Sequence, residues 1–324
     1  MMRSRPAKAP GSIGEPVPEP VAVLDLGSNS FHLLVGGLAG DGSLTVRARG
    51  KHMVRLGSAI GRAGSGPPVL GEEAAARGHA AIRSLVQIAR LHSPIRTLGV
   101  ATSIFREAAN AAGFLRAVHE EHAIPIEVLT GDAEARLTYL GAVGGLPAGL
   151  GVTAVVEVGG GSVQIAVGTE TDSRLTASLP LGVVRLRHQL RADGVLRPTD
   201  VRAITTLVRQ QAKDVAEAVR AAAPRTFVLA AGTARALAAL AGLQPGAPLG
   251  RDQVVSLMSR LCLLTPSGVG LLGVEPARED TVASGAVVIA TLMELLGASS
   301  ALVADGGLRE GVLARELAML AAAE

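Results

Sequence analysis

VLDLGSNSFHLLVG, residues 23–36, recurs 132 positions later as VVEVGGGSVQIAVG, residues 155–168. The two segments align without a gap, with Asp25 on Glu157 and Ser30 on Ser162. Further identities are Gly27 on Gly159, Val35 on Val167 and Gly36 on Gly168. Each segment is typical of a strand that ends in a carboxylate, a turn of small residues and a second strand. The repeat therefore predicts a protein built from two related halves.

The small residues of the two turns can bring backbone N–H groups together around an anion such as a phosphate. A carboxylate at the end of the preceding strand can hold a hydrated divalent cation against the phosphate oxygens. A single glycine turn of this kind is ordinary in hairpins, whereas two copies in register are not. We therefore expect two phosphate loops that face each other across a cleft between the halves.

The rest of the chain alternates between strand patterns and helical patterns, with a Gly/Pro break at 144–151. Strands are expected at 21–25, 31–35, 95–101, 124–129, 226–231 and 301–305, with a further strand-rich start at 152. Helices are expected at 72–91, 106–123, 132–143, 200–223, 234–240, 252–264 and 308–323. Thr102 and Ser103 are suitable caps for the helix that follows them. This alternation is typical of an α/β protein with largely covered sheets.

Composition excludes several classes of protein. The chain has 324 residues, enough for two domains, and a net charge of only +3. Its one cysteine, Cys262, excludes a disulfide framework and a multi-cysteine metal centre. With no Trp, one Tyr and four Phe, the chain lacks the stacking platforms of single-strand nucleic-acid binding, so we expect no nucleic-acid partner. No Walker lysine motif is present, which excludes P-loop chemistry.

The two most unusual segments do not predict targeting or membrane insertion. The longest apolar run, 282–293, is too short to span a bilayer. Residues 1–20 are rich in proline and lack an apolar core, which predicts a disordered leader rather than a signal peptide. We therefore expect a cytoplasmic protein that has no membrane partner.

Four other segments match, in order, the motifs of one family. ATSIFREAAN (101–110) resembles its ATSAxRxAxN segment, and PIEVLTGDAEARLTYLGAV (125–143) resembles its PIEVISGxEEARL helix. LAAGTARALAAL (229–240) resembles a GGTxTxLAAL strand-to-helix turn, and VADGGLREGVL (303–313) a terminal SDxGLREGVL signature. Together with the two loops, they resemble the exopolyphosphatase / guanosine pentaphosphate phosphohydrolase family (Ppx/GppA). The resemblance covers nearly the whole chain, from residue 21 to about 317.

This resemblance implies a two-domain actin-like (ribonuclease H-like) ATPase fold, α/β in class, with duplicated halves and the active site in the interdomain cleft. The first domain would comprise residues 21–136 and the second 137–307, and the terminal helix, 308–324, would return to the first domain. The family also allows a homodimer.

The implied reaction is release of terminal orthophosphate from inorganic polyphosphate or from the guanosine pentaphosphate pppGpp. By resemblance, Glu134 is the catalytic base and Asp25 and Glu157 hold Mg²⁺. Gln164 stands where the family has a Glu, and its amide can position water but cannot take a proton. The phosphate-binding residues implied in the same way are Gly27, Ser28, Asn29, Ser30, Ser103, Arg106, Gly159, Gly160, Gly161 and Ser162. Ser103 has a second interpretation as a helix cap only.

Four positions depart from the family pattern. Glu157 replaces the usual Asp, Gln164 replaces a Glu, and Ala133 replaces the first Glu of its helix. His32 replaces an Arg, which exchanges a fixed cation for a group that is either neutral or charged. These departures support an alternative: a catalytically impaired homologue that binds polyphosphate or a guanosine alarmone as a sensor. A sugar or acetate kinase of the same superfamily is a third reading, disfavoured by the short chain and the GLREGVL ending.

Two other clusters have less specific interpretations. His119 and His122 are three residues apart on one predicted helix and lack a third metal ligand nearby, so we interpret them as an exposed face. Arg185, Arg187 and Arg191 follow the second loop and would line a polyphosphate channel or form a solvated helix face.

Overall fold

The computed structural model describes residues 19–323 except 57–66, 171, 191–193 and 245, so most of the predicted leader lies outside the described residues. The first half of the chain forms a five-stranded sheet in the order β3-β2-β1-β4-β5. Its strands are β1 (Val21–Leu26), β2 (Ser30–Leu38), β3 (Leu44–Met53), β4 (Arg96–Ala101) and β5 (Ile126–Val128). Helices α1 (Glu72–Arg90), α2 (Ser103–Glu107) and α3 (Ala111–His122) accompany it.

Alternation along β1 explains why its residues 21–24 are all apolar. Ala22, Leu24 and Leu26 face the core that includes residues of α1 and α3, whereas Val21 and Val23 face the core on the opposite side of the sheet. A strand covered on both faces has no polar side, so it appears in the sequence as a continuous apolar run.

The second half forms a six-stranded sheet in the order β10-β11-β9-β6-β7-β8. Its strands are β6 (Val152–Val158), β7 (Val163–Thr169), β8 (Asp172–Leu179), β9 (Thr226–Ala230), β10 (Leu249–Gly250) and β11 (Ser300–Val303). Its helices are α5 (Val183–Leu190), α6 (Pro198–Ala221), α7 (Ala231–Leu240), α8 (Arg251–Leu261), α9 (Pro266–Gly270), the 3₁₀ turn η2 (Pro276–Arg278) and α10 (Val282–Leu296). Helix α10 contains the long apolar run, and it packs against α6 and α8. In the part of the chain that the structure describes, no helix is long and apolar enough to cross a membrane.

The sequence repeat is also a structural repeat. Five strands follow the same order in both sheets, β3-β2-β1-β4-β5 in one and β8-β7-β6-β9-β11 in the other. Both β2 and β7 carry a bulge at the same place in the repeat, between Val35 and Gly36 and between Val167 and Gly168. A Cβ atom on Gly36 would lie 2.3 Å from the Thr45 carbonyl oxygen, and one on Gly168 2.0 Å from that of Asp172. The predicted duplication and α/β class are therefore confirmed, and the two repeated glycines are required by the bulges.

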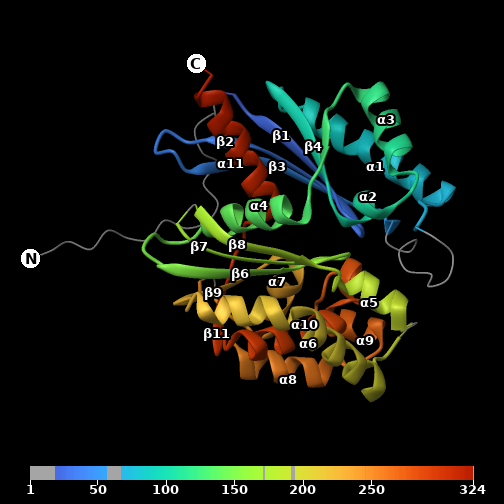
Figure 1. The fold of residues 1–324 in the computed structure, drawn as a ribbon. Coiled ribbons are helices and arrows are strands. Elements are labelled where there is room, and N and C mark those ends of the chain that lie inside the picture. The colour runs from blue at the N-terminus through green and yellow to red at the C-terminus, as the bar shows by residue number, and fades with distance from the viewer. Residues whose placement is uncertain (1–18, 57–66, 171, 191–193, 245, 324) are drawn as a thin grey trace, which may run out of the picture.

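Helices α4 (Gly131–Val143) and α11 (Leu308–Ala321) form a layer between the two sheets (Figure 1). Val312 and Leu313 of α11 belong to a core with Val23 of β1, whereas Ala135 and Tyr139 of α4 belong to a core with the second sheet. The two helices approach closely, because a Cβ on Gly141 would lie 1.9 Å from the Gly307 carbonyl oxygen. The domain boundary expected near residue 136 thus falls inside a helix of this central layer.

The helix expected at 106–123 is interrupted, which corrects the prediction. It consists of α2 and α3, separated at residues 108–110. The Asn110 side chain accepts a hydrogen bond from the Leu70 amide and donates one to the Leu70 carbonyl, both 2.9 Å long. Thr102 occupies the N-cap position of α2 without a side-chain capping bond, and Ser103 lies inside the helix. Neither residue therefore acts as the cap that the sequence suggested.

Candidate active site

The two repeated loops lie against each other. Gly27–Asn29 follows β1 and Gly159–Ser162 follows β6, and each turn is closed by a bond from the Gly27 or Gly159 amide to the serine carbonyl three residues later, 3.3 and 2.9 Å. A Cβ on Gly161 would lie 2.1 Å from the Ser103 hydroxyl and 2.6 Å from that of Ser28. Only glycine fits at this contact, so the glycine-rich sequence of the second loop allows the two halves to meet.

A cavity of about 120 Å³ opens at this junction. It is lined by every residue that the sequence assigned to the site except Arg106: Asp25, Gly27, Ser28, Asn29, Ser30, Ser103, Glu134, Glu157, Gly159, Gly160, Gly161, Ser162 and Gln164. The space is suited to a phosphoryl group and a water molecule. We call it the phosphate cavity.

Glu134 lies in the first turn of α4 and is held by Arg106. Thr130 caps the helix, its hydroxyl accepting a 3.2 Å bond from the Ala133 amide. Arg106 Nη1 donates to Glu134 Oε2 over 2.6 Å and to the Leu129 carbonyl over 2.9 Å. Arg106 was expected to bind phosphate; the structure instead directs Nη1 toward the carboxylate. Burial raises the pKa of Glu134 to about 7, although Arg106 opposes the rise. A carboxyl group with such a pKa is suited to general base chemistry near neutral pH.

Asp25 and Glu157 end the two repeated strands and share the phosphate cavity. Burial raises the pKa of Asp25 to about 7, although the Arg309 guanidinium lowers it, and burial also raises the pKa of Glu157. Glu157 Oε2 is buried and, within the described residues, makes no hydrogen bond of good geometry, although the nearby Thr138 hydroxyl lowers the pKa of Glu157. An unpaired buried carboxylate oxygen is costly, and a cation would remove that cost.

Asp25 and Glu157 suit Mg²⁺ only if water and substrate phosphates complete its coordination. In the described part of the chain, no group of three or more His, Cys, Asp or Glu side chains has the arrangement of a metal site. Mg²⁺ is commonly bound by one or two carboxylates together with water and substrate phosphates. Asp25 and Glu157 fit that mode, and the pair His119 and His122 does not form a metal cluster.

Gln164 orients two hydroxyl groups. Its side-chain nitrogen Nε2 donates to the hydroxyls of Ser162 and Ser178, each over 3.0 Å. Because Ser162 accepts this bond, its own O–H remains able to donate to a phosphate oxygen. A glutamate at this position would instead accept the serine proton. Because Nε2 already donates to both serines, the side-chain oxygen Oε1 of Gln164 is the atom available to position a water.

His32 connects the phosphate cavity with Arg309. It stands opposite Asp25 in the β1–β2 register, as Gln164 stands opposite Glu157 in the second half. Arg309 Nη1 donates to His32 Nδ1 over 3.1 Å, so the ring proton lies on Nε2, which donates to the Ser30 hydroxyl over 2.7 Å. Burial and then the surrounding cations keep the pKa of His32 well below its usual value. The residue is therefore a neutral positioning group rather than a charge switch.

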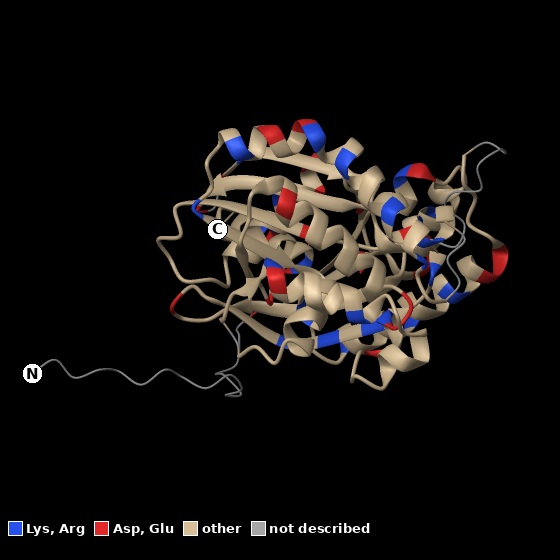
Figure 2. Ribbon diagram, turned by 90° about the horizontal axis from the view of Figure 1, so that it is seen from below, with Lys and Arg blue, Asp and Glu red and all other residues tan. Residues whose placement is uncertain are grey.

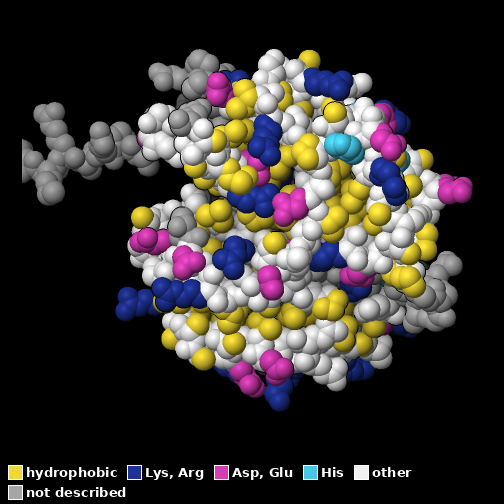
Figure 3. Space-filling model, turned by 45° about the horizontal axis from the view of Figure 1, so that its top comes forward, with side chains coloured by type: hydrophobic (Ala, Val, Ile, Leu, Met, Phe, Trp, Pro, Cys, Tyr) yellow, Lys and Arg dark blue, Asp and Glu magenta, His cyan; other side chains and the backbone are white. Residues whose placement is uncertain are grey.

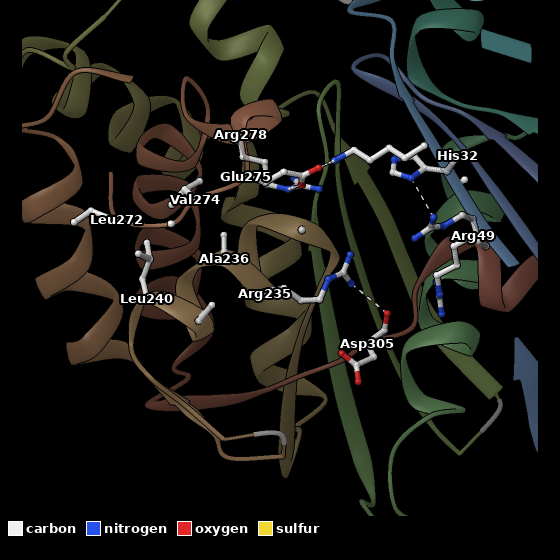
Figure 4. A pocket seen from close by; sticks show the side chains of 16 residues that line it. His32, Arg49, Arg235, Ala236, Leu240, Leu272, Val274, Glu275, Arg278 and Asp305 are labelled. Carbon is white, nitrogen blue, oxygen red and sulfur yellow. Dashed lines mark hydrogen bonds and ion pairs between the residues drawn. The ribbon is translucent and has the colours of Figure 1, made fainter. Parts of the chain in front are cut away.

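A second cavity, of about 750 Å³, adjoins the phosphate cavity and shares His32, Gly232 and Arg278 with it. We call it the cationic cavity. Its five basic residues come from four elements: Arg49 and Lys51 from β3, Arg235 from α7, Arg278 from η2 and Arg309 from α11. Two acids, Glu275 and Asp305, also line it. Figure 4 shows the charged side chains converging from both halves, with apolar residues Ala236, Leu240, Leu272 and Val274 on the side of α7.

Sequence reasoning missed this cavity. Its cations are spread from residue 49 to residue 309 and belong to no common motif. Two signals were available: Arg235 and Arg309 lie inside the family-like segments 229–240 and 303–313, and Arg49 and Lys51 are two residues apart on β3, so they share one face of the strand. No local sequence pattern points to Arg278. Its guanidinium packs against Gly232, where an added Cβ atom would lie 1.8 Å from the Arg278 side chain.

Arg185 supports the second loop from behind. Its Nε donates to the Gly161 carbonyl over 2.9 Å, and its Nη2 donates to Glu107 Oε1 over 2.5 Å. The side chain is buried, so Arg185 belongs neither to a channel wall nor to a solvated face. It joins α5 in one half to α2 in the other. Arg191 lies outside the described residues.

Charge over the rest of the molecule is mixed. Figure 2 shows Lys and Arg positions interspersed with Asp and Glu positions along the outer helices. Basic and acidic side chains also stand near one another on the face shown in Figure 3. The concentration of arginines in the cationic cavity is therefore a local feature of the cleft.

Comparison with known proteins agrees with this architecture. The model of the Ppx/GppA phosphatase family matches residues 38–320. An uncharacterized protein of Streptomyces coelicolor is 32% identical over 306 residues, covering 91% of this chain and 90% of the relative. The crystal structure of an exopolyphosphatase from Cytophaga hutchinsonii superimposes with a TM-score of 0.83 at 23% identity, covering 93% of this chain and 98% of that one. The Ppx/GppA family member of Aquifex aeolicus gives a TM-score of 0.76 at 25% identity, with coverage of 93% and 98%.

Proposed function

This chain belongs to the Ppx/GppA phosphatase family, and we propose that it releases terminal orthophosphate from inorganic polyphosphate. The observation that carries the proposal is the junction of the two cavities. The phosphate cavity holds the base and the two loops, and it meets a larger cavity lined by five cations. A linear polyanion fits this arrangement with its terminal group among the loops and its remaining phosphates among the arginines.

The loops bind the terminal phosphoryl group in this proposal. Backbone amides of 28–29 and 160–162, which lie beyond the two amides that close the turns, supply donors for its oxygens together with the hydroxyls of Ser28, Ser30 and Ser162. Gln164 and His32 fix two of these hydroxyls before substrate arrives. Donors that are already oriented cost little reorganisation during the reaction.

Glu134 accepts the proton of the attacking water. Arg106 occupies Oε2, so we assign the water's proton to Oε1. As the water oxygen bonds to the terminal phosphorus, the bridging P–O bond breaks and the shortened chain leaves with its negative charge. The guanidiniums of Arg278 and Arg309 stabilise that charge. Products are orthophosphate and a polyphosphate one unit shorter.

Asp25 and Glu157 are the residues that would hold Mg²⁺. When bound, this ion supplies charge neutralisation to the phosphoryl oxygens. Each of the two carboxylates comes from one half of the molecule, so they can bind the ion together only when the halves are closed on each other.

The nucleotide pppGpp is a second candidate substrate, favoured by one observation. Ala236, Leu240, Leu272 and Val274 form an apolar wall in the cationic cavity. A polyphosphate makes no use of such a wall, whereas a nucleoside attached to a polyphosphate would pack against it.

The deciding experiment measures phosphate release by the purified chain with Mg²⁺ and, in parallel, long-chain polyphosphate, pppGpp and ATP. The Glu134→Gln variant serves as the blank. Release from polyphosphate or pppGpp that disappears in the variant supports the hydrolase and identifies its substrate. Tight binding without release from any of them would instead identify a sensor that retains the fold of a hydrolase.

A further inference from the structure

Glu275 is one of two acids in a cavity whose other charged lining residues are five cations. It immediately precedes η2 in the second half of the chain and reaches across the cleft to Lys51 on β3 of the first half, which donates to Oε1 (Figure 4). Its second oxygen, Oε2, lies 3.5 Å from Arg278 Nε. Each carboxylate oxygen thus contacts a different cation of the cavity.

The other two acids near these cations differ from Glu275 in their contacts. Glu310 pairs with Arg49 over 2.7 Å, but it also accepts a 3.0 Å bond from the Gly307 amide at the start of α11. Asp305 contributes its backbone carbonyl, which accepts from Arg235 over 3.1 Å. The Glu275 contacts, in contrast, are to the cations Lys51 and Arg278. Its side chain is 51% exposed, so it can move into solvent without opening the core.

We propose that Glu275 is a counter-ion that occupies the position of a substrate phosphate group and is displaced from Lys51 and Arg278 when a polyanion enters. The inference rests on the proposed function and assigns Glu275 a part in substrate specificity. A chain long enough to reach Lys51 has to displace the carboxylate, whereas orthophosphate in the phosphate cavity does not reach it. Glu275 lines only the cationic cavity, so it sets the KM of long substrates rather than kcat.

The test is Glu275→Gln, which keeps the shape and removes the charge. At low ionic strength we expect the KM for long-chain polyphosphate to fall about three- to tenfold with kcat unchanged, because a competing ion pair is removed. This decrease in KM should become smaller as salt is added, since added ions screen the ion pair between Glu275 and Lys51. Glu294→Gln is the matched control: Glu294 is 52% exposed and pairs with Arg209 over 2.8 Å, away from both cavities.

Lys51 provides a second variant. In a Lys51→Gln background, Glu275→Gln should lower KM less than it does in the wild type, because the displaced pair no longer exists. The proposal is overturned if Glu275→Gln leaves the KM unchanged, or lowers it no more than Glu294→Gln does. A raised KM also overturns it and assigns the Lys51–Glu275 pair to holding the halves closed.

Binding separates this inference from the proposed function. Calorimetry on Glu134→Gln and on Glu134→Gln/Glu275→Gln measures the affinity for long-chain polyphosphate and for orthophosphate without turnover. We expect the double variant to bind the long chain about three- to tenfold more tightly and orthophosphate equally. This result would support the counter-ion even if the wild type proved to be no hydrolase. Equal affinity for the long chain, or no binding by either protein, overturns it.

Discussion

Arg106 donates from one nitrogen, Nη1, to both the Glu134 carboxylate and the Leu129 carbonyl. The arginine belongs to α2, which follows β4, and the glutamate to the first turn of α4. The contact fixes one oxygen of the proposed base and moderates the rise of its pKa caused by burial. The two residues lie in separate sequence motifs, and this ion pair gives those motifs a common function.

Replacement of Glu134 by Gln should lower turnover by at least about two orders of magnitude, as loss of a general base does. Binding of polyphosphate should persist, because the loops and cations remain. Phosphate release and calorimetry measure the two effects. Asp132→Asn on the same helix removes an exposed charge but keeps an oxygen that can accept from Thr176, so it is the control and should stay active. Full turnover by Glu134→Gln would exclude Glu134 as the base.

Replacement of Arg106 by Gln should move the acid limb of the kcat/KM profile to higher pH. The base must be deprotonated to act, and the pKa of Glu134 is about 7 with Arg106 present. Without the guanidinium this pKa should rise by about one unit or more, so activity at pH 7 falls and recovers partly at pH 8.5. An acid limb that does not move, with activity lost equally at all pH values, would assign Arg106 to phosphate binding instead.

The metal-free protein should become less stable as the pH rises toward 8. Burial raises the pKa of Asp25 from 3.8 to about 7. Between those values the folded protein binds more protons than the unfolded chain, so this contribution to stability is full below pH 4 and is lost as the pH rises through 7. The free energy of unfolding of Asp25→Asn, taken relative to that of the wild type, should therefore increase by roughly 2 kcal/mol between pH 5 and pH 8. Denaturant unfolding in EDTA measures the difference, and a constant difference would contradict the raised pKa.

Mg²⁺ should raise the melting temperature of the wild type without any substrate. An ion present at about 100 times its Kd stabilises a protein by about 2.7 kcal/mol. Glu157→Gln should lose most of this increase, because it removes one of the two proposed ligands, and Asp132→Asn should keep it. Equal stabilisation of wild type and Glu157→Gln would place the ion elsewhere.

Ala231→Gly should stabilise the fold by about 0.5–1 kcal/mol. Ala231 begins α7 with φ 66°, a left-handed conformation that costs an L-residue about 1–2 kcal/mol. Part of the gain is offset because glycine also makes the unfolded chain more flexible. Ala238→Gly, inside the same helix, should have the opposite sign and cost about 1 kcal/mol. Thermal unfolding compares the two; destabilisation by both would show that the strain at Ala231 is absent.

The local sequence pattern was sufficient to predict the duplicated architecture and most of the residues that line the phosphate cavity. The repeat at an offset of 132 predicted both loops, and Gly36 and Gly168 recur because each bulge places a carbonyl where a Cβ would be. Loop residues and strand-end carboxylates are adjacent in sequence, so their common site follows from local geometry. Local pattern failed at Asn110, where a side chain that clamps Leu70 interrupts the predicted helix.

Only the packing of the halves determined the rest of the site. Lys51, Arg278 and Arg309 come from a strand, a 3₁₀ turn and the last helix, and no spacing in the sequence relates them. Their convergence depends on the central layer of α4 and α11, which sets how the two sheets face each other. The sequence by itself therefore determined where the two proposed phosphate loops lie, because each loop is a contiguous stretch of backbone. The partners of Glu134 and of the cations were decided by tertiary structure, because long side chains meet across whatever surfaces the packing brings together.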